Sequence, residues 1–553
     1  MIKQNFNKLY EKSFSENFDL PALTDYKAKT HSYGEVAAQI ARMHLLYEAL
    51  GMKRGDKVAV FGKNSANWCI SFMSVTSFGG VIVPILSDFK PEDAHTIINH
   101  SDAIGLLVDK STMEKLSEKE MKGVKVIVAL DDFTLLNEKP SAELKKAFDG
   151  LDEGFAKKYP EGFKKEDIVF AEVDNSELAE INYTSGTTGF SKGVMLTANS
   201  LAGNVDFAMR SIELYAGDRM VSLLPLAHSY GCAFDFLFPL ATGVHVTILG
   251  KLPAVPVIIK AFDDVKPHLI LFVPIFFEKL YKNKLLPTLK KPHMKLLTKI
   301  PGINGIIYGA FHKKLRETFG GVFREAVLGG AGLGAEVEDF MVRIRYPFTI
   351  GYGMTECGPL ISYSNWDKTR KGSSGRILDT MELRIESEDP YNVPGEILVR
   401  GENLMLGYYK NEEATAEAID KDGWLHTGDL GVTDKDGFIY IKGRSKSMLL
   451  GSSGQNIYPE EIEARLCNLP FVSEAVVLMN KDHRLEALVY PDAEQLKAAG
   501  ESQRVAEIME ENRKAVNQQL AAYETLLKIH IQDKEFEKTP KRSIKRFLYK
   551  LDQ

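Results

Sequence analysis

The alternation of amphipathic helices with short buried strands is the feature that most constrains how this chain folds. The segment SYGEVAAQIARMHLLYEALG begins with Ser32 and Glu35 at capping-box spacing, carries apolar residues every three or four positions and ends at Gly51. The apolar run KVAVFG follows, and GGVIVPIL, AIGLLVD and KVIVALDD repeat the pattern. Parallel strands that are covered by helices on both faces have this apolar character. The fold class is therefore predicted as α/β, with helix-covered β-sheets.

The pattern changes after about residue 444. Short strands are expected there in EAVVLMN, LEALVYP and KIHIQD, with helices at 459–468 and 501–523. A chain of 553 residues is too long for one compact core. We therefore expect a large N-terminal domain, residues 1–443, and a small C-terminal α+β domain, residues 444–553.

Composition and charge exclude several classes of protein. The net charge of −6 argues against nucleic acid as the main partner, because such binders need an excess of Lys and Arg. The four cysteines show no CxxC spacing, so neither a disulfide framework nor a zinc site is predicted. The N-terminus lacks the apolar core of a signal peptide, and no run of 18 apolar residues occurs. We expect a cytoplasmic protein. The charge-rich, weakly patterned stretch 136–180 is expected to be a surface excursion.

The stretch KTPKRSIKRFLYK, residues 538–550, is a local exception to the acidic balance, with six basic residues and no acid. Its cations stand beside Phe547, Leu548 and Tyr549, a combination that suits a membrane surface with anionic lipid. Peripheral membrane contact through this tail is kept as one alternative.

The first chemical signal is YTSGTTGFSKGVMLT, residues 183–197. It contains six Ser or Thr hydroxyls and three glycines, and it follows the strand start LAEIN. Such a loop lets backbone amides and hydroxyls converge on phosphate oxygens, with Lys192 near by. The P-loop pattern GxxxxGK[ST] is absent, because Lys192 is followed by Gly193. The stretch is predicted to be a phosphate-binding loop, and a plain flexible turn is the alternative.

The loop closely resembles the signature of the adenylate-forming (AMP-binding) superfamily, which includes acyl-CoA synthetases, luciferases and nonribosomal adenylation domains. Further motifs that resemble this superfamily follow in order: LPLAHSYG (224–231), GGA (329–331), GYGMTECGP (351–359), GWLHTGDLG (423–431) and GRSKSMLLGSSGQNIYPEEIE (443–463). The resemblance covers nearly the whole chain from about residue 20. It implies that a carboxylic acid attacks the α-phosphate of ATP to form an acyl-adenylate, which then reacts with CoA.

The resemblance assigns the nucleotide-binding residues. The β- and γ-phosphates are expected to bind Thr184, Ser185, Gly186, Thr187, Thr188, Gly189 and Lys192. The backbone of Gly329, Gly330 and Ala331 is expected to line the adenine and acyl pocket. Of the remaining candidates, Tyr352 stacks on adenine, Thr355 reaches the α-phosphate, Glu356 holds Mg²⁺, and Asp429 and Arg444 bind the ribose hydroxyls.

Three further positions carry roles that the resemblance implies. His228 in LPLAHSYG corresponds to a residue at the mouth of the acyl pocket, although a lone His on an apolar stretch is more often a packed core residue. Lys446 is the expected hinge of the small domain. Rotation about it would bring Gly454 towards the pantetheine tunnel of CoA, where a side chain would obstruct the thiol.

The tail departs from the superfamily pattern. Members carry a catalytic Lys before an Ile near the C-terminus, and here Ser543 occupies that position. A serine supplies no charge, and the loss of one such donor costs about 10² to 10³ in rate. Lys541 and Lys545 lie two residues to either side, on the same face of an extended segment. We predict that one of them replaces the missing Lys; an impaired adenylation step is the alternative.

A dinucleotide-binding site is disfavoured. VLGGAGLGAEVEDFMVRI formally matches GxGxxA between a strand and a helix, with Gly330, Gly332 and Ala335. A Rossmann unit needs an acid at the end of the next strand, whereas here that strand, YPFTIGYG, runs into the Tyr352 motif.

The expected function is that of an ATP-dependent, AMP-forming acid:CoA ligase with Mg²⁺, acting on a medium- or long-chain fatty acid. GENLMLGYYKNEEATAEAIDKDGWLHTGDLG resembles fatty acyl-CoA synthetases more than amino-acid adenylation domains. Two alternatives remain: an enzyme that loads an acyl carrier protein, and a weakly active or regulatory member. GCAFDFLFPLATG and HLILFVPIFFEKLYKNKLL are rich in Phe and Leu, and suit an acyl-chain wall and a plain core equally.

Overall fold

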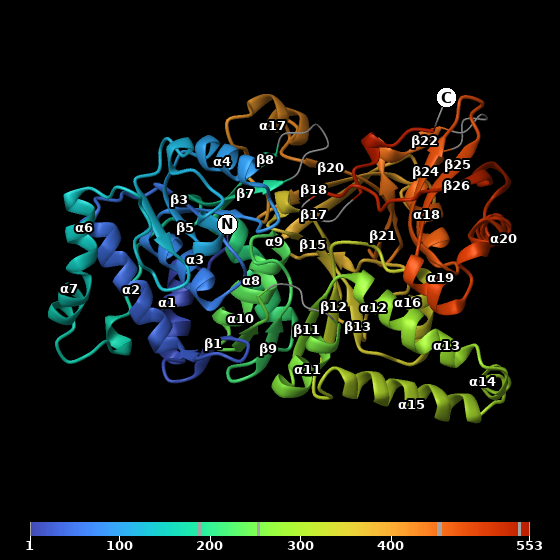
Figure 1. Ribbon diagram of the computed structural model, residues 1–553, viewed down its shortest axis with the longest axis horizontal. Coiled ribbons are helices and arrows are strands. Elements are labelled where there is room, and N and C mark those ends of the chain that lie inside the picture. Colours follow the sequence, from blue (N-terminus) through green and yellow to red (C-terminus); the bar gives the residue numbers. More distant parts are fainter. Residues whose placement is uncertain (1, 185–190, 251–254, 451–455, 540–543, 552–553) are drawn as a thin grey trace.

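The structure is a computed structural model that describes residues 2–184, 191–250, 255–450, 456–539 and 544–551. Figure 1 shows a large body and, at its right, a smaller C-terminal unit coloured orange to red. This arrangement confirms the predicted α/β fold with a small C-terminal α+β domain. Among the residues described, no helix combines the length and the apolar character that a membrane crossing requires.

The first expected helix forms as predicted. Helix α2 spans Tyr33–Ala49. The hydroxyl of Ser32 accepts a bond of 3.1 Å from the amide of Glu35, and the Glu35 carboxylate accepts one of 3.0 Å from the amide of Ser32. These bonds satisfy amides that the first helical turn leaves without partners.

The first large sheet contains seven strands in the order β19-β8-β7-β4-β3-β5-β6. Their bounds are β3 (Lys57–Phe61), β4 (Val81–Ile85), β5 (Ala103–Val108), β6 (Val126–Ala129), β7 (Leu178–Thr184), β8 (Lys192–Thr197) and β19 (Gly407–Tyr408). Strands β7, β4, β3, β5 and β6 pair in parallel, as their apolar runs predict, whereas β8 and β19 are antiparallel. The hairpin of β7 and β8 positions the predicted phosphate loop, which connects its two strands.

The second large sheet also contains seven strands, in the order β13-β12-β11-β9-β10-β1-β2. Their bounds are β1 (Pro21–Asp25), β2 (Thr30–Ser32), β9 (Arg219–Ser222), β10 (His245–Ile248), β11 (Leu269–Phe272), β12 (Glu325–Leu328) and β13 (Phe348–Ile350). All its pairs are parallel except β1 with β2. The GGA motif follows β12 and the Tyr352 motif follows β13, so the carboxyl ends of adjacent strands bring these motifs together.

Helices lie between and around the two sheets (Figure 1). They are α1 (Phe6–Glu16), α3 (Ala66–Phe78), α4 (Pro91–His100), α5 (Lys110–Met113), α8 (Ala198–Ser211), α9 (Ser229–Gly231), α10 (Phe238–Ala241), α11 (Val255–Val265), α12 (Pro274–Leu280), α13 (Leu286–Leu289), α14 (Pro292–Leu297), α15 (Ile303–Thr318), α16 (Ala335–Arg343) and α17 (Glu412–Ala418). Helix α3 is apolar on all sides and buried along almost its whole length, as expected of a helix enclosed by other elements.

Two antiparallel sheets, which the sequence analysis did not anticipate, lie between the large sheets and the C-terminal unit (Figure 1). The first contains β14 (Tyr352–Gly353), β15 (Leu360–Tyr363) and β16 (Arg376–Ile377), and the second contains β17 (Met381–Glu386), β18 (Gly395–Gly401), β20 (Leu425–Thr433) and β21 (Ile439–Arg444). They matter for function because the predicted adenine and ribose contacts lie on them, namely Tyr352 on β14, Asp429 on β20 and Arg444 on β21.

The small domain is built on β24 (Val472–Met479), β25 (Leu485–Pro491) and β26 (Leu526–Ile531). Helices α18 (Pro459–Cys467), α19 (Ala493–Ala499) and α20 (Val505–Asn517) cover one face, and a short hairpin of β22 (Leu449–Leu450) and β23 (Asn456–Ile457) precedes them. The three predicted strands and the helix at 459–468 are confirmed, whereas the helix expected over 501–523 is shorter. The division at residue 443 stays a prediction.

The stretch 136–180 differs in part from expectation. It contains two helices, α6 (Ala142–Asp149) and α7 (Leu151–Lys158), which lie at the left end in Figure 1. Phe155 of α7 is buried, and the guanidinium of Arg42 lies 4.4 Å from the centroid of its ring. Few apolar residues anchor these helices, which is why the sequence pattern was weak.

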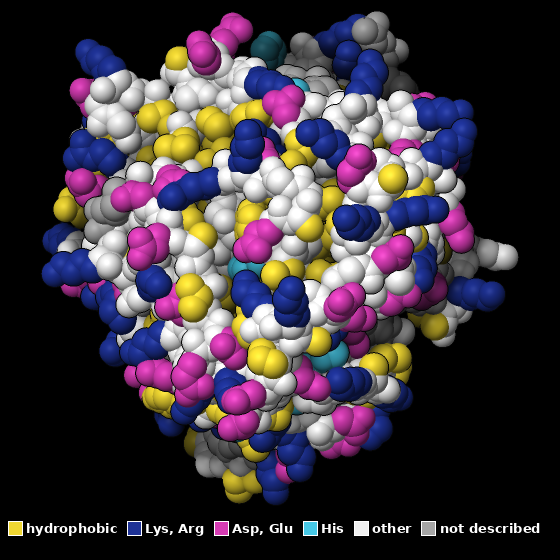
Figure 2. Space-filling view, turned by 90° about the vertical axis from the view of Figure 1, so that its left-hand side faces the viewer, with side chains coloured by type: hydrophobic (Ala, Val, Ile, Leu, Met, Phe, Trp, Pro, Cys, Tyr) yellow, Lys and Arg dark blue, Asp and Glu magenta, His cyan; other side chains and the backbone are white. Residues whose placement is uncertain are grey.

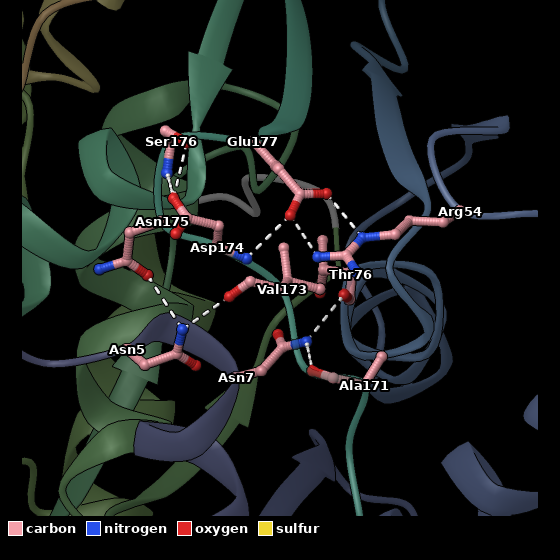
Figure 3. A network of polar contacts seen from close by, with 10 residues as sticks. All are labelled: Asn5, Asn7, Arg54, Thr76, Ala171, Val173, Asp174, Asn175, Ser176 and Glu177. Atoms are coloured by element: carbon pink, nitrogen blue, oxygen red, sulfur yellow. Dashed lines mark hydrogen bonds and ion pairs between the residues drawn. The ribbon is translucent and has the colours of Figure 1, made fainter.

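Figure 3 shows how helix α1 is tied to the body. Asn5, which caps α1, donates a bond of 2.7 Å to the carbonyl of Val173, and Asn7 donates one of 2.9 Å to the carbonyl of Ala171. The segment that these bonds hold leads directly into β7. The N-terminal helix therefore helps to fix the strand that precedes the phosphate loop.

Candidate active site

The predicted phosphate loop begins and ends in the hairpin of β7 and β8. Thr184 pairs in register with Lys192, and its hydroxyl donates a bond of 3.5 Å to the Lys192 carbonyl. The loop residues Ser185, Gly186, Thr187, Thr188 and Gly189 lie outside the described part of the chain. The structure therefore places the two ends of the predicted cradle.

Tyr408 on β19 links the loop to the predicted metal ligand. Its hydroxyl donates a bond of 2.9 Å to Glu356 Oε1, and Lys192 Nζ lies 4.7 Å from the centroid of its ring. Burial and the charge of Glu356 raise the pKa of Tyr408, so its hydroxyl stays protonated as a donor. No role was predicted for Tyr408 from the sequence, although it lies in GENLMLGYYKNEEATAEAIDKDGWLHTGDLG, one of the segments that resemble the superfamily.

Asp429 is the centre of the predicted ribose site. It accepts a bond of 2.7 Å from the Tyr352 hydroxyl, and its other oxygen lies 2.9 Å from Arg444 Nε. The register of β20 with β21 places Asp429 opposite Arg444. Burial raises the pKa of Asp429, while the Arg444 charge and the Tyr352 bond lower it and the charge of Glu356 raises it. The Tyr352 bond joins the predicted ribose acceptor to the segment that also carries Glu356.

Thr355 and His228 come together from distant parts of the chain. The hydroxyl of Ser229, next to His228, donates a bond of 3.4 Å to the buried Thr355 hydroxyl. His228 precedes α9, and its Nδ1 accepts a bond of 3.2 Å from the amide of Tyr230. In the neutral imidazole this leaves the proton on Nε2.

The GGA motif packs against the same segment. A Cβ atom at Gly329 would lie 2.9 Å from the ring of Tyr230, and Gly330 has a φ of +83°. The Tyr230 hydroxyl donates a bond of 3.2 Å to the carbonyl of Val327. Glycine is therefore required at 329 by close approach and favoured at 330 by backbone conformation, and Ala331 follows as an exposed residue.

The hinge and tunnel candidates lie where β21 leaves the large body. Lys446 is exposed in a single helical turn, Ser445–Ser447, directly after β21. This position suits a pivot, and the hinge role stays a prediction. Gly454 lies outside the described residues.

The basic tail packs on the small domain. Phe536, Ile544, Tyr549 and Leu551 cover the face of the small sheet that the helices leave open. Arg546 Nη1 lies 2.6 Å from both carboxylate oxygens of Glu463.

Two further basic side chains in the described part of the tail also lie near acids of the same domain. Lys538 pairs with Glu474 and Glu535. Lys545 Nζ lies 3.9 Å from Glu537 Oε2. Lys541 and Ser543 lie outside the described residues.

The Phe-rich segments pack as core in this structure. Phe236 is fully buried against Trp68 and Phe72. In the second core, Phe272 and Phe276 stack with centroids 4.5 Å apart. Of the two interpretations left open, the packing favours the core for these side chains.

Comparison with known proteins decides the family. The family model described as AMP-binding enzyme matches residues 10–409, and the model of the AMP-binding enzyme C-terminal domain matches residues 446–550. The chain belongs to the AMP-binding enzyme family. Its enzymes are acid–thiol ligases that use ATP with Mg²⁺, and CoA as co-substrate.

Individual relatives of this AMP-binding enzyme differ in their acids. The protein named long-chain-fatty-acid–CoA ligase FadD15 of Mycobacterium bovis is 29% identical over 83% of this chain and 77% of its own length. A 4-coumarate–CoA ligase of Vanilla planifolia is 27% identical over 82% and 77%. The crystal structure of the anthranilate CoA ligase AuaEII with anthranoyl-AMP covers 99% of this chain and 96% of its own, with 20% identity and a TM-score of 0.78. This likeness shows the shared fold.

The residues present fit the Mg²⁺ that the family uses. Mg²⁺ is usually held by one or two carboxylates together with substrate phosphates and water. Glu356 supplies one half-buried carboxylate, oriented by Tyr408 and next to the ring that Lys192 contacts. Among the described residues, no group of three or more His, Cys, Asp or Glu forms a closed metal site, and this phosphate-dependent mode needs none.

Proposed function

We propose that this AMP-binding enzyme activates a medium- or long-chain fatty acid with ATP and transfers the acyl group to CoA. The observation that carries the proposal is the convergence of three polar clusters: Tyr352 with Asp429 and Arg444, Tyr408 with Glu356 and Lys192, and Ser229 with Thr355. They come from five separate motifs. Together they offer an aromatic face, a ribose acceptor and a set of phosphate contacts, which are the parts that adenylation needs.

The roles follow from the chemistry of each group. Asp429 accepts from the ribose hydroxyls and Arg444 donates to them, while Tyr352 presents its ring to adenine. Thr355 donates to the α-phosphate. Glu356 would hold Mg²⁺, which would supply positive charge that stabilises the phosphate oxygens.

The reacting carboxylate and α-phosphate are contacted from two sides. His228 lies beside Ser229 at the Thr355 end of the site and contacts the carboxylate of the acid. Lys541 or Lys545 reaches the α-phosphate during adenylation. Because Lys545 pairs only at 3.9 Å with Glu537 in this arrangement, little holds it there.

The second half-reaction uses the small domain, residues 444–553, which pivots at Lys446 on the large domain, residues 1–443. Gly454 then leaves space for the pantetheine arm, so that the CoA thiol attacks the acyl-adenylate carbonyl and AMP leaves. We place the enzyme in the cytoplasm.

The fatty-acid assignment rests on the family-like segment and on relatives such as FadD15. A 4-coumarate–CoA ligase among the relatives makes an aromatic acid the main competitor. ATP–pyrophosphate exchange over a panel of octanoate, palmitate, 4-coumarate and anthranilate tests both. We expect exchange with the fatty acids at least tenfold above that with the aromatic acids. The reverse order would overturn the substrate class, and no exchange with any acid would overturn the activity.

The acceptor is tested by AMP release with CoA against release with an acyl carrier protein, and we expect CoA to be the acceptor. The lysine assignment is tested by Lys541→Ala and Lys545→Ala, made singly. One of them should slow exchange by about 10² to 10³, the cost of losing a donor to a developing anion. Lys550→Ala, in the same tail, is the matched control. If neither variant slows exchange, the replacement of the Lys missing at Ser543 is wrong.

A further inference from the structure

Residues 279–316 form the most basic part of the chain. They contain ten Lys or Arg and no Asp or Glu, in a protein whose net charge is −6. The basic residues are Lys279, Lys282, Lys284, Lys290, Lys291, Lys295, Lys299, Lys313, Lys314 and Arg316. None of the motifs that define the active site lies here, so adenylation does not account for this bias.

Helices α13, α14 and α15 fold this stretch into an arm, which extends along the lower edge of the molecule to its lower right corner in Figure 1. No residue of α13 or α14, all of which the structure describes, is buried, and in α15 only Leu315 is buried. Helices that are exposed to this extent form a surface that can contact another molecule or a membrane.

Apolar residues gather at the end of the arm, which we define as the arm tip, residues 290–307. Leu296 is 65% exposed and Ile306 is 75% exposed, and Ile300 and Ile303 are also exposed. The apolar residues nearer the body behave differently: Leu286, Leu289, Tyr308 and Phe311 pack against the second core. The outward apolar residues are therefore not the inner face of an amphipathic helix.

Lysines surround these apolar residues. Lys290, Lys291, Lys295 and Lys299 are all exposed, and none of them forms an ion pair with any described residue. The opposite end of the molecule, seen in Figure 2, has Lys and Arg interspersed with Asp and Glu. The arm tip is thus an apolar patch in a segment, residues 279–316, whose charged side chains are all basic.

We propose that the arm tip docks on a membrane surface that contains anionic lipid. Leu and Ile enter the boundary between headgroups and acyl chains, while the long stems of the lysines keep their ammonium groups among the phosphates. A protein partner is less well matched, because protein interfaces favour aromatic residues and disfavour Lys, and residues 290–307 contain no Phe, Tyr or Trp. Nucleic acid would leave the exposed Ile and Leu without a role.

Sedimentation with vesicles tests the docking without reference to activity. The full chain should bind vesicles of phosphatidylcholine with phosphatidylserine, bind phosphatidylcholine alone far more weakly, and lose affinity as salt rises. Lys295→Gln with Lys299→Gln should weaken binding about twenty-five-fold, because each lysine near an anionic surface contributes about fivefold. Leu296→Ser with Ile306→Ser should weaken it at least tenfold.

Matched controls come from outside the arm. Lys145→Gln with Lys146→Gln, both exposed on α6, and Val169→Ser, 69% exposed, should bind as the unchanged chain does. Unchanged circular dichroism and pyrophosphate exchange in solution would show that the arm variants are folded, and keep this test separate from that of the proposed function.

Several outcomes would overturn the proposal. They are the absence of binding to phosphatidylserine vesicles, equal losses in the controls, and a loss that follows Phe547→Ser with Leu548→Ser in the tail instead of the arm. A dimer in solution that Leu296→Ser with Ile306→Ser dissociates would show that a second copy covers the patch.

Discussion

The pKa of the Glu180 carboxyl shows how strongly burial disfavours a charge inside this enzyme. It lies on β7, is 1% exposed and accepts a bond of 2.7 Å from Asn182, which also donates to the carbonyl of Ala227, next to His228. Burial raises the pKa of Glu180 to about 7 against an ordinary 4.5. The pKa of buried Asp235 is also raised to about 7 by burial. Both groups hold their protons in the folded state at pH values where the unfolded chain has lost them.

Glu180→Gln tests this at the residue scale. As the pH rises from 4.5 to 7, the unfolded state releases the Glu180 proton while the folded state keeps it, so stability falls across this window. The Gln variant stays neutral and avoids the loss. It should be more stable than the unchanged enzyme at pH 8 by on the order of 3 kcal/mol, and similar at pH 4.5. Urea unfolding at both pH values measures the difference.

Exposed Glu172→Gln, eight residues before Glu180, is the control and should change neither value. An equal effect of Glu180→Gln at pH 4.5 and pH 8 would show that packing, and not ionisation, is responsible.

At the scale of elements, the two-residue strand β19 connects parts of the site that are far apart in sequence. It pairs with β8, and the amide of Tyr409 donates a bond of 2.7 Å to the carbonyl of Gly193, directly after Lys192. The amide of Met405 donates one of 2.9 Å to the carbonyl of Glu356. This segment therefore fixes Tyr408 between the loop and the metal ligand through backbone bonds on both sides.

Tyr408→Phe tests this positioning role. The variant keeps the ring that Lys192 contacts and loses the bond to Glu356. The loss of an outer partner of a metal ligand typically costs about tenfold or more, so the Mg²⁺ concentration for half-maximal exchange should rise by about tenfold. Titration of exchange with Mg²⁺ measures it.

Tyr409→Phe is the matched control. It removes the hydroxyl of the next residue in the chain, which donates a bond to exposed Asp102 and not to Glu356. A fall in maximal rate with no change in the Mg²⁺ requirement would contradict the positioning role of Tyr408.

At the scale of the whole molecule, the small domain rests against the large one through a few close contacts. Asn468 lies so near that its Oδ1 would be 2.8 Å from a Cβ atom at Gly334. Lys282 donates to the carbonyl of Cys467. Lys442 Nζ lies 3.5 Å from Glu461 Oε1. These contacts define one orientation of a domain that needs two orientations if the proposed function is right.

A disulfide between Gly334→Cys and Asn468→Cys should lock this orientation. Either pyrophosphate exchange or the CoA-dependent release of AMP from added acyl-adenylate should then fall by at least tenfold while the other persists, and a reductant should restore the lost step. The neighbouring thiol of Cys467 interferes little, because burial raises its pKa to about 12. Exchange and AMP release, measured with and without reductant, provide the readout.

Asn468→Cys alone, and the pair in a Cys467→Ser background, serve as controls. If the crosslinked enzyme performs both half-reactions at full rate, the small domain does not need to rotate.

Several elements could be predicted from the sequence, and the resemblance to the superfamily supplied the candidate site residues, whose roles stay predictions. The cap at Ser32 and the apolar runs of β3 to β6 are local patterns, and local patterns follow from covalent geometry and burial. Tyr408 could not be assigned, because strand pairing brings it to Lys192 from more than 200 residues away in the chain, and its other partner, Glu356, is 52 residues away. The positive charge of the tail can be read from the sequence. Its packing on the small sheet cannot, because it depends on contacts between residues that are distant in the chain.

The sequence by itself determined the α/β class, the order of the nucleotide motifs and the serine at the expected lysine position, because each depends on residues that are near one another in the chain. Tertiary structure alone decided that Asp429 is held by Tyr352 and Arg444, that Tyr408 orients Glu356, and that apolar residues at the arm tip stay outside every core. Burial and pairing between distant residues are properties of the folded chain, since only packing sets which side chains lose water and which partners they find.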